Sequence, residues 1–392
     1  MTEWREVKLG DVCLSVSYGY TASATQIFSG AKFLRITDIV PYFIDWDAVP
    51  YCKISEKDFK KYKLNIGDIV IARTGATTGY NAVIEHDFNA VYASYLIRFK
   101  PNKEIFLPKF AKYILKTTYY KKFIENNISG SAQPGINAQT LSLFSFLLPP
   151  LDVQRKIAGV LGALDDKIEL NNKINQNLEA QAQALFKSWF IDFEPFGGKM
   201  PIDWKIGKLS DIAEYSNDTI STEFTSFENY ISTENMLPNR GGISRASSLP
   251  TGNTVKSYRT TDVLISNIRP YFKKIWFALF SGGCSNDILV FRSKKDSPAF
   301  VFNVLNQDDF FEYVMSGANG SKMPRGDKKH IMQYKVIIPS AKTIKEFENI
   351  AITFLEKFSN NNQENVRLAE LRDTLLPKLM NGEIDVDNVK ID

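Results

Sequence analysis

The segment from Arg73 to Tyr80 combines the residue types with which a protein loop contacts nucleic acid. It reads Arg-Thr-Gly-Ala-Thr-Thr-Gly-Tyr and directly follows an apolar run that is typical of a buried strand. Glycines let backbone N–H groups approach phosphates closely, while hydroxyl and cationic side chains can reach base edges. The Lys-Ser/Thr pair of a nucleotide-binding phosphate loop is missing, and a plain hairpin loop is the alternative. The candidate contact residues here are Arg73, Thr74, Thr77, Thr78 and Tyr80.

Three further segments carry polar or cationic side chains of the same kind. The loop Ser129–Asn137 (SGSAQPGIN) has a Gln and an Asn that can read base edges, or it is a structural loop. In the second half of the chain, cations gather with an aromatic ring between positions 269 and 274, and cations recur between 322 and 325. Solvated surface is the alternative for these cations. The candidates are Ser131, Gln133, Asn137, Arg269, Tyr271, Lys273, Lys274, Lys322 and Arg325.

The composition is that of an ordinary globular chain. Of 392 residues, 44% are hydrophobic and 23% are charged, and the net charge is +4. No run of eighteen apolar residues occurs and the N-terminus has no signal-peptide pattern, so we expect a cytoplasmic protein. Cys13, Cys52 and Cys284 are too few and too scattered for a disulfide framework or a zinc site.

The sequence carries no recognisable catalytic motif. The two histidines, His86 and His330, have no plausible metal ligands beside them in the sequence. It contains no Gly-x-Ser-x-Gly, no nucleotide-binding loop and no dinucleotide fingerprint. A site assembled from distant residues would escape this search. We therefore expect a protein that holds and reads another molecule, with no metal and no cofactor bound by this chain.

Two stretches 190 residues apart share one helical hydrophobic period. From Ile157, alternating steps of four and three residues reach Leu161, Leu164, Ile168, Asn171, Asn175, Leu178, Ala182, Leu185 and Trp189. Adding 190 to each number gives Phe347, Ala351, Phe354, Phe358, Asn361, Asn365, Leu368, Arg372, Leu375 and Leu379. This period is typical of helices that lie along one another. The alternative is two amphipathic helices on separate cores.

Two asparagines interrupt each apolar seam at matching steps. An Asn in an apolar seam costs stability unless it finds a partner, and its best-attested role is to fix the register of packed helices. We therefore predict that the two helices pack against each other. An antiparallel arrangement would bring Asn171 and Asn175 near Asn361 and Asn365.

The repeat extends into the segments before each helix. Glu3–Val12 (EWREVKLGDV) returns as Asp203–Ile212 (DWKIGKLSDI), and Gly67–Arg73 (GDIVIAR) has a weaker echo in Thr261–Asn267 (TDVLISN). One unit is thus written twice. The predicted parts are a globular domain at 1–150, a helical region at 151–192, a second globular domain at 193–340 and a helical region at 341–392.

Positive charge lies on the globular parts. Residues 1–150 hold 18 Lys and Arg against 13 Asp and Glu, a balance of +5, and residues 193–340 hold 18 against 15, a balance of +3. The helical regions have balances of −1 (5 against 6) and −3 (7 against 10). A modest basic excess on the globular parts is a weak indication of a polyanionic partner.

Runs of β-branched and aromatic residues predict strands in both globular parts, and together with helices they indicate an α+β fold. The expected strands are 32–39, 68–72, 95–99, 144–148, 230–232, 262–265, 274–280 and 288–291. A helix is expected over 108–126. The long helices should begin near Asp152 and at a capping box from Thr343 to Glu346, and Pro377 should end or kink the second one near its last turn.

The helical segments resemble a known family. Leu147–Phe196 is similar to the central conserved region of type I restriction-modification DNA specificity subunits, and Asp373–Val386 to their C-terminal conserved segment. The strand and Thr-Gly loop after Gly67, and the SGSAQPGIN loop, resemble recurring parts of their target recognition domains. The second half departs from the pattern, with GSKMPRGD in place of the Gln-Pro-Gly loop, as a different half-site would require.

This resemblance implies two α/β target recognition domains, each reading half of a split DNA target, separated by two long antiparallel coiled helices, with an internal pseudo-twofold repeat. It implies two docked methyltransferase subunits that use S-adenosylmethionine, and motor-nuclease subunits that use ATP and Mg²⁺. The chain itself is implied to be non-catalytic. The alternatives are a specificity subunit of a stand-alone DNA adenine methylase or related system without a motor nuclease, a non-DNA adaptor, and a self-sufficient enzyme.

Helix geometry gives the spacer a length. Residues 157–189 span roughly 50 Å at ~1.5 Å per residue, on the order of one to one-and-a-half turns of duplex DNA. We predict a target of two short blocks separated by a fixed number of unread base pairs.

Overall fold

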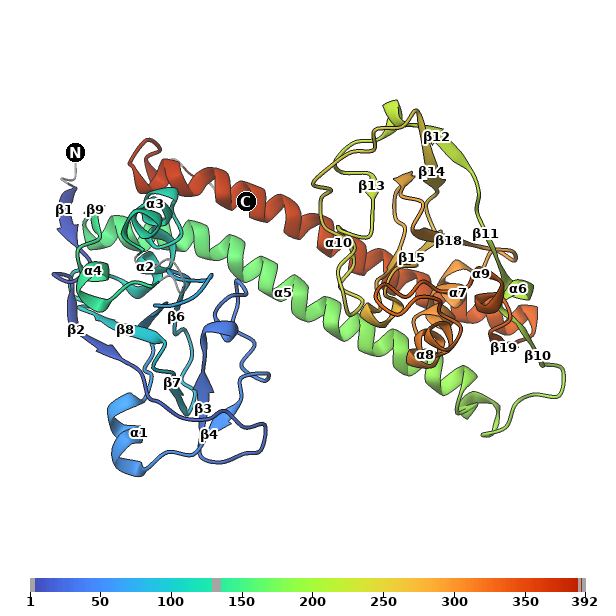
Figure 1. Cartoon of the computed structure of the whole chain (residues 1–392), viewed down its shortest axis with the longest axis horizontal. Coiled ribbons are helices and arrows are strands. Elements are labelled where there is room, and N and C mark those ends of the chain that lie inside the picture. Colours follow the sequence, from blue (N-terminus) through green and yellow to red (C-terminus); the bar gives the residue numbers. More distant parts are fainter. Residues whose placement is uncertain (1–3, 129–134, 387–388, 390–392) are drawn as a thin grey trace. The chain divides into compact units, whose positions relative to one another are not determined.

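The computed structural model describes residues 4–128, 135–386 and 389, which fall into two compact units. Unit 1 comprises residues 1–170 and 364–392, and unit 2 comprises residues 171–363. Two helices of 40 residues, α5 (Leu151–Phe190) and α10 (Ala341–Met380), contribute to both units (Figure 1). The globular part before α5 is head 1, and the globular part between α5 and α10 is head 2.

Head 1 is built on an antiparallel sheet of β2, β8, β5 and β6 in that order, beside a smaller sheet of β4, β3 and β7. All four side chains of the central β5 (Ile-Val-Ile-Ala) are buried, which explains its continuous apolar run. The strands are β1 (Arg5–Lys8), β2 (Cys13–Tyr18), β3 (Ala31–Leu34), β4 (Tyr51–Cys52), β5 (Ile69–Ala72), β6 (Asn81–Val83), β7 (Ala90–Tyr92), β8 (Leu96–Pro101) and β9 (Ser145–Leu148). The helices are η1 (Ile36–Asp38), α1 (Glu56–Tyr62), α2 (Pro108–Ile114), α3 (Thr118–Asn127) and α4 (Ala138–Ser142).

Head 2 repeats this plan, with an antiparallel sheet of β11, β18, β15 and β16. The strands are β10 (Lys205–Lys208), β11 (Ala213–Tyr215), β12 (Thr219–Ser221), β13 (Tyr230–Ile231), β14 (Thr254–Tyr258), β15 (Val263–Ser266), β16 (Ile275–Phe277), β17 (Gly282–Cys284), β18 (Ile288–Ser293) and β19 (Lys335–Ile338). The helices are η2 (Glu194–Phe196), α6 (Leu209–Ile212), η3 (Thr222–Phe224), η4 (Pro270–Phe272), α7 (Pro298–Leu305), α8 (Asp308–Ser316) and α9 (Lys328–Ile331).

The internal duplication predicted from the sequence is confirmed strand by strand. β1 pairs antiparallel with β9 in head 1, as β10 pairs with β19 in head 2, and the two main sheets have the same strand order. The heads differ in their smaller sheets, where head 2 has β12, β14, β17 and β13 in place of β4, β3 and β7. The conserved parts therefore form the frame, and the middle of each head is free to differ.

An ion pair between an aspartate and an arginine of the main sheet is also repeated in the two heads. In head 1, the Asp68 carboxylate accepts from the Asn65 backbone N–H at 2.9 Å and lies 3.7 Å from the Arg98 guanidinium. In head 2, Asp262 binds Arg292 with two bonds of 2.8 and 2.9 Å and closes the same kind of turn. The hydrogen bonds between Arg292 and the Asp262 carboxylate raise the pKa of the arginine guanidinium, so the ion pair stays charged.

The two long helices run antiparallel within each unit. In unit 1, Asp165 of α5 bonds to Arg372 of α10, and Lys167 lies 3.6 Å from Glu364. In unit 2, Asn175 bonds to Asn361, and the rings of Phe190 and Phe347 are 5.0 Å apart. The predicted antiparallel packing is therefore what the structure shows inside each unit.

The first turns of the long helices also fasten one helix of each head. The Gln154 amide oxygen of α5 accepts from the Leu107 backbone N–H at 2.9 Å, at the start of α2. The Glu348 carboxylate of α10 accepts from Ala299 N–H at 2.8 Å and Phe300 N–H at 3.0 Å, at the start of α7. A side chain from the spacer thus satisfies the free N–H groups of a head helix in both units.

Four expectations about elements were wrong. The helix expected at 108–126 is two helices, because the Thr117 hydroxyl accepts from Tyr120 N–H and starts α3 afresh. The strand expected to reach Ile39 ends at Leu34, where η1 begins, and the strand expected to reach Phe280 ends at Phe277.

The start of α10 accounts for the fourth. It starts at Ala341 with the Ser340 hydroxyl accepting from Thr343 N–H, so the cap lies three residues before the expected one. Pro377 lies in the last turn of α10, which ends at Met380, close to the end predicted from the proline.

Candidate nucleic-acid interface

In head 1 the two loops singled out in the sequence lie side by side. Thr74 forms an antiparallel bridge with Gly135, and Ile136 N–H donates to the Arg73 carbonyl at 2.9 Å. Asn137 then caps α4 by accepting from Thr140 N–H at 2.8 Å. The end of β5 and the start of α4 thus form one surface from segments about sixty residues apart.

The 73–80 loop is held by its own backbone. Ala72 N–H donates to the Tyr80 carbonyl at 2.7 Å, and Gly79 N–H donates to the Ala72 carbonyl at 2.8 Å. Gly79 has a φ of +89°, and a Cβ there would lie 2.7 Å from the Ile124 side chain, so only glycine fits. The Thr78 hydroxyl is buried and donates to the Gly75 carbonyl. The loop is rigid at its base and exposes Tyr80, which is 47% accessible.

The side chain of Arg73 packs against a tyrosine ring. Its guanidinium lies 4.8 Å from the centre of the Tyr18 ring, within the range of a cation–π contact. Its backbone N–H donates to the Tyr95 carbonyl at 3.0 Å, and the Tyr18 hydroxyl accepts from Ala138 N–H at 3.1 Å. Tyr18 and Tyr95 are both exposed, and sequence reasoning missed them because they reach the loop only through the sheet.

Head 2 brings the corresponding loops together in the same way. Ile268 forms an antiparallel bridge with Arg325, and Arg269 N–H donates to the Pro324 carbonyl at 2.8 Å. Asp327 caps α9 by accepting from His330 N–H at 2.7 Å. The strand-end loop after β15 and the loop before α9 therefore form one surface, as in head 1.

Most of the cations predicted for head 2 have partners. Lys273 Nζ lies 2.6 Å from the Asp308 carboxylate, whose hydrogen bonds to Arg240 and Lys273 hold the pKa of that carboxyl down at about 2. Lys274 Nζ donates to the Thr233 carbonyl at 2.6 Å, and burial lowers the pKa of its ammonium group. These two lysines support the loop.

The other candidates are distributed over the two surfaces. The Arg325 guanidinium is 3.1 Å from the Asp287 carboxylate, while Lys322 and Tyr271 are exposed. Ser131 and Gln133 lie outside the described residues.

Sequence reasoning missed Asn267, which occupies in head 2 the place that Arg73 occupies in head 1. Asn267 N–H donates to the Asp287 carbonyl just before β18, as Arg73 N–H donates to the Tyr95 carbonyl just before β8. The Asn267 carbonyl accepts from Gly326 N–H just before the cap of α9, as the Arg73 carbonyl accepts from Ile136 N–H. The weak echo of GDIVIAR in TDVLISN was the signal that aligned the two residues.

Three of the four predicted register asparagines, Asn171, Asn175 and Asn361, belong to unit 2. Asn361 Nδ2 donates to Asn175 Oδ1 at 2.8 Å, and Asn175 Nδ2 donates to Asn362 Oδ1 at 2.8 Å. Asn171 is 1% exposed in the same unit, and Asn365 is half-buried on the part of α10 that belongs to unit 1. Asn175 thus uses both ends of its amide across the helix pair.

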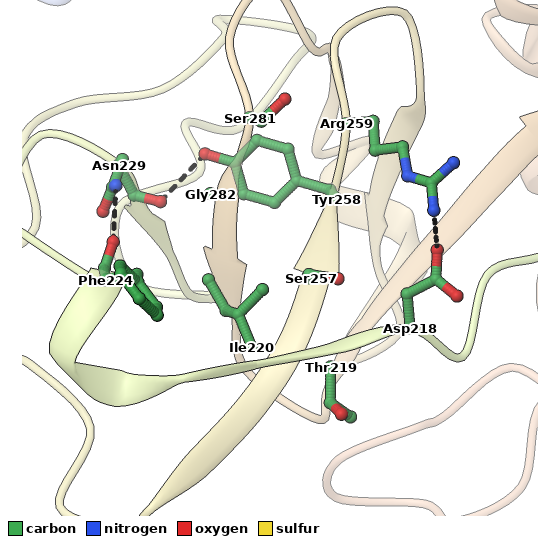
Figure 2. Close-up of a pocket in the computed structure, with 10 residues that line it drawn as sticks. All are labelled: Asp218, Thr219, Ile220, Phe224, Asn229, Ser257, Tyr258, Arg259, Ser281 and Gly282. Atoms are coloured by element: carbon green, nitrogen blue, oxygen red, sulfur yellow. Dashed lines mark hydrogen bonds and ion pairs between the residues drawn. The ribbon is translucent and has the colours of Figure 1, made fainter.

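A cavity of about 550 Å³ lies elsewhere in head 2, on the sheet of β12, β14 and β17 (Figure 2). Its polar groups bind one another. The Tyr258 hydroxyl donates to the Asn229 carbonyl, Asn229 Nδ2 donates to the Phe224 carbonyl, and Arg259 pairs with Asp218. The loops around Arg73 and Asn267 are therefore better candidates for a recognition site.

Within the described ranges, no helix is long and apolar enough to cross a membrane. In the same part of the chain, no three His, Cys, Asp or Glu side chains gather in a way that would hold a metal ion.

Comparison with known proteins points to one family. Residues 1–180 match the family described as type I restriction modification DNA specificity domain. The chain is 26% identical to the type I restriction enzyme HindI specificity subunit of Haemophilus influenzae, over 98% of this chain and 100% of that protein. It is also 26% identical to the MjaIX specificity subunit of Methanocaldococcus jannaschii, over 86% of this chain and 82% of that one. Over most of its length the chain is therefore similar to specificity subunits of type I restriction enzymes.

The fold agrees with this assignment. A crystal structure of the type I restriction-modification system S subunit from M. genitalium has a TM-score of 0.64 to this chain, covering 97% of it and 96% of the other, at 15% identity. The likeness confirms the α+β class with two heads and long helices. Both relatives are named as specificity subunits of type I restriction enzymes.

Proposed function

We propose that this chain is a specificity subunit that binds a DNA target in two parts, one read by each head. The observation that carries the proposal is the repeated surface at the end of β5 and β15. In both heads a strand-end loop is bridged to a helix-capping loop, through Thr74–Gly135 in head 1 and Ile268–Arg325 in head 2. The same backbone frame carries different side chains in the two heads, which is what reading two different half-sites requires.

The chemistry of these surfaces suits a duplex. Exposed cations and tyrosine hydroxyls can contact phosphates, which position a protein on DNA without reading its sequence. Side chains whose backbone is held at the start of a loop can reach the edges of nucleobases in the major groove, where the four base pairs are distinguishable. Lys322, Tyr80 and Tyr271 are exposed for the first role, and Arg73 is placed for the second.

The duplication also supports two equivalent partner sites. A frame that occurs twice, each time with a two-stranded sheet leading into a long helix, offers two similar docking surfaces. We propose that each binds one methyltransferase subunit and that motor-nuclease subunits join this assembly, acting on DNA in the cytoplasm. S-adenosylmethionine, ATP and Mg²⁺ would belong to those partners.

Because α5 and α10 are each continuous over 40 residues, we further propose that they fix the number of unread base pairs between the two parts of the target. An unbroken helix lengthens by ~1.5 Å for each inserted residue, so the gap should respond to helix length.

The proposal is tested by co-expressing the chain with its cognate methyltransferase subunit in a host without other DNA methylation, followed by methylome sequencing. We expect one two-part motif with a constant gap, methylated only when this chain is present. Purified chain should bind DNA of that motif with an affinity that falls steeply as salt rises, since phosphate contacts release counterions. A motif that persists without the chain, or binding that ignores salt, would contradict the proposal.

A further inference from the structure

Arg73 in head 1 and Asn267 in head 2 are equivalent positions of the repeated frame, and both carry an unsatisfied polar atom. In the described part of the chain, Arg73 Nε and Asn267 Oδ1 are buried and have no hydrogen-bond partner. A buried polar group left without a partner costs about 1–3 kcal/mol. Six such side-chain atoms occur among the described residues, and two of them fall at one repeated position, which calls for an explanation.

The backbone at both positions is fixed from two sides. At each position, the backbone N–H donates to the carbonyl of the residue just before a neighbouring sheet strand. The backbone carbonyl accepts from the N–H of the residue just before a helix cap. The four distances are 3.0 and 2.9 Å for Arg73, and 2.8 and 3.3 Å for Asn267. The side chain therefore leaves the same point of the frame in both heads, with little freedom in its backbone.

Neighbouring side chains leave the two polar groups without a partner. The Arg73 guanidinium lies over the Tyr18 ring and forms no ion pair with any described residue. Arg98 on strand β8 differs in having a carboxylate 3.7 Å from its guanidinium, although its Nε also lacks a hydrogen-bond partner. A Cβ at Gly326 would lie 2.9 Å from Asn267 Oδ1, so the glycine leaves room around the amide. Both positions thus hold a polar atom that no described residue satisfies.

The chemistry of each group selects a base. A guanidinium presents parallel N–H donors that match the O6 and N7 acceptors of guanine, whereas a carboxamide presents one acceptor and one donor that match N6–H and N7 of adenine. The unsatisfied atom agrees in both cases, because Arg73 lacks an acceptor and Asn267 lacks a donor.

Resting on the proposed function, we propose that Arg73 and Asn267 are the specificity-determining residues of the two heads. Arg73 reads a guanine in the part of the target bound by head 1, and Asn267 reads an adenine in the part bound by head 2.

The test is an exchange of the two residues in the chain co-expressed with its methyltransferase subunit, followed by methylome sequencing. Arg73→Asn should change one position of one part of the motif from G·C to A·T or to any base pair. Asn267→Arg should change one position of the other part from A·T to G·C or to any base pair. In both variants the other part and the gap should stay unchanged.

A binding assay covers variants that no longer support methylation. The purified chain is titrated with duplexes that carry each single base-pair change in the wild-type motif. Arg73→Asn should lose roughly 5- to 150-fold discrimination at one G·C pair, the range given by about 1–3 kcal/mol at 1.4 kcal/mol per tenfold. Arg73→Lys should keep part of it, because a lysine can also donate to guanine O6 and N7. Lys322→Ala is the contrast variant and should weaken binding to all duplexes alike.

The outcomes separate the two proposals. Absence of any motif that depends on the wild-type chain would overturn the proposed function. A wild-type motif that neither exchange alters, or a loss of affinity that is equal for all duplexes, would overturn the assignment of Arg73 and Asn267 while leaving DNA reading intact.

Discussion

The Asp165 carboxylate is the point at which head 1 is fastened to both long helices within unit 1. Its Oδ2 accepts from the hydroxyls of Tyr42 and Tyr113 at 2.9 Å each, and Lys112 Nζ lies 3.4 Å away. Its Oδ1 accepts from Arg372 Nη1 of α10 at 2.9 Å. The carboxylate is 1% exposed, so water cannot replace these partners.

Asp165→Asn keeps the size of the side chain and removes its charge. Arg372 and Lys112 would then stay buried opposite a neutral amide, and the amide N–H₂ would face groups that are themselves donors. Burial raises the pKa of both Tyr42 and Tyr113, so neither hydroxyl ionises to supply the missing charge. Breaking a buried ion pair in this way costs about 3–5 kcal/mol, and we expect the unfolding free energy of unit 1 to fall by that amount.

Hydrogen exchange measured by mass spectrometry resolves the two units, because peptides from each are followed separately. Protection in the slowest peptides of unit 1 should fall by roughly 3–5 kcal/mol, with unit 2 peptides much less affected. Asp166→Asn is the matched control, since Asp166 is the exposed neighbour on the same helix. Surface substitutions of this kind change stability by about 0.5 kcal/mol or less.

A double-mutant cycle with Arg372→Ala separates the pair from its surroundings. Removing both charges should cost less than the sum of the two single changes, because neither partner is then left alone. The reasoning is refuted if Asp165→Asn costs no more than Asp166→Asn, or if the two single changes simply add.

Three further predictions concern pH and register. Burial raises the pKa of Glu348 above its ordinary 4.5, so the folded state binds the proton more tightly and unfolding free energy should fall as pH rises through that range. Glu348→Gln, which gives head 2 the residue type that head 1 uses, should abolish this slope in urea titrations; an unchanged slope contradicts it. Burial lowers the pKa of Lys116 from 10.5 to about 8. The free energy of unfolding should therefore rise between pH 8 and 9.5, and this rise is part of a total gain of roughly 3 kcal/mol that the pKa shift gives. Lys116→Met should remove the rise and the exposed control Lys121→Met should keep it, whereas equal curves for both would argue against the burial effect. Replacing Asn171 and Asn361 with Leu should keep the fold but loosen helix register or promote association between chains, and a monomer with unchanged target spacing would refute this.

The sequence alone determined the features that neighbouring residues encode. Apolar residues recur with a period of 3.5 residues in both helical segments, so the long helices and their matching asparagines could be predicted without coordinates. The internal repeat could be predicted for the same reason, since finding it requires only the order of the residues. The α+β class, the buried β5 and the loop at its end followed from local patterns as well.

Helix ends and turns were harder to predict from the sequence, because several neighbouring side chains compete there for the same backbone groups. A single hydroxyl at Thr117 divides one expected helix into two, and Ser340 takes the cap expected at Thr343. Both outcomes depend on which N–H group lies in reach, which spacing alone does not decide.

Only the tertiary structure decided which distant groups meet. The bridge between Thr74 and Gly135, and the convergence of Tyr42, Tyr113 and Arg372 on Asp165, join residues separated by tens to hundreds of positions. Such contacts arise when sheets and helices pack, and the energy of a buried charge or an unpaired amide depends on all its neighbours at once. The matching backbone hydrogen bonds of Arg73 and Asn267 are also of this kind, since they exist only in the folded heads.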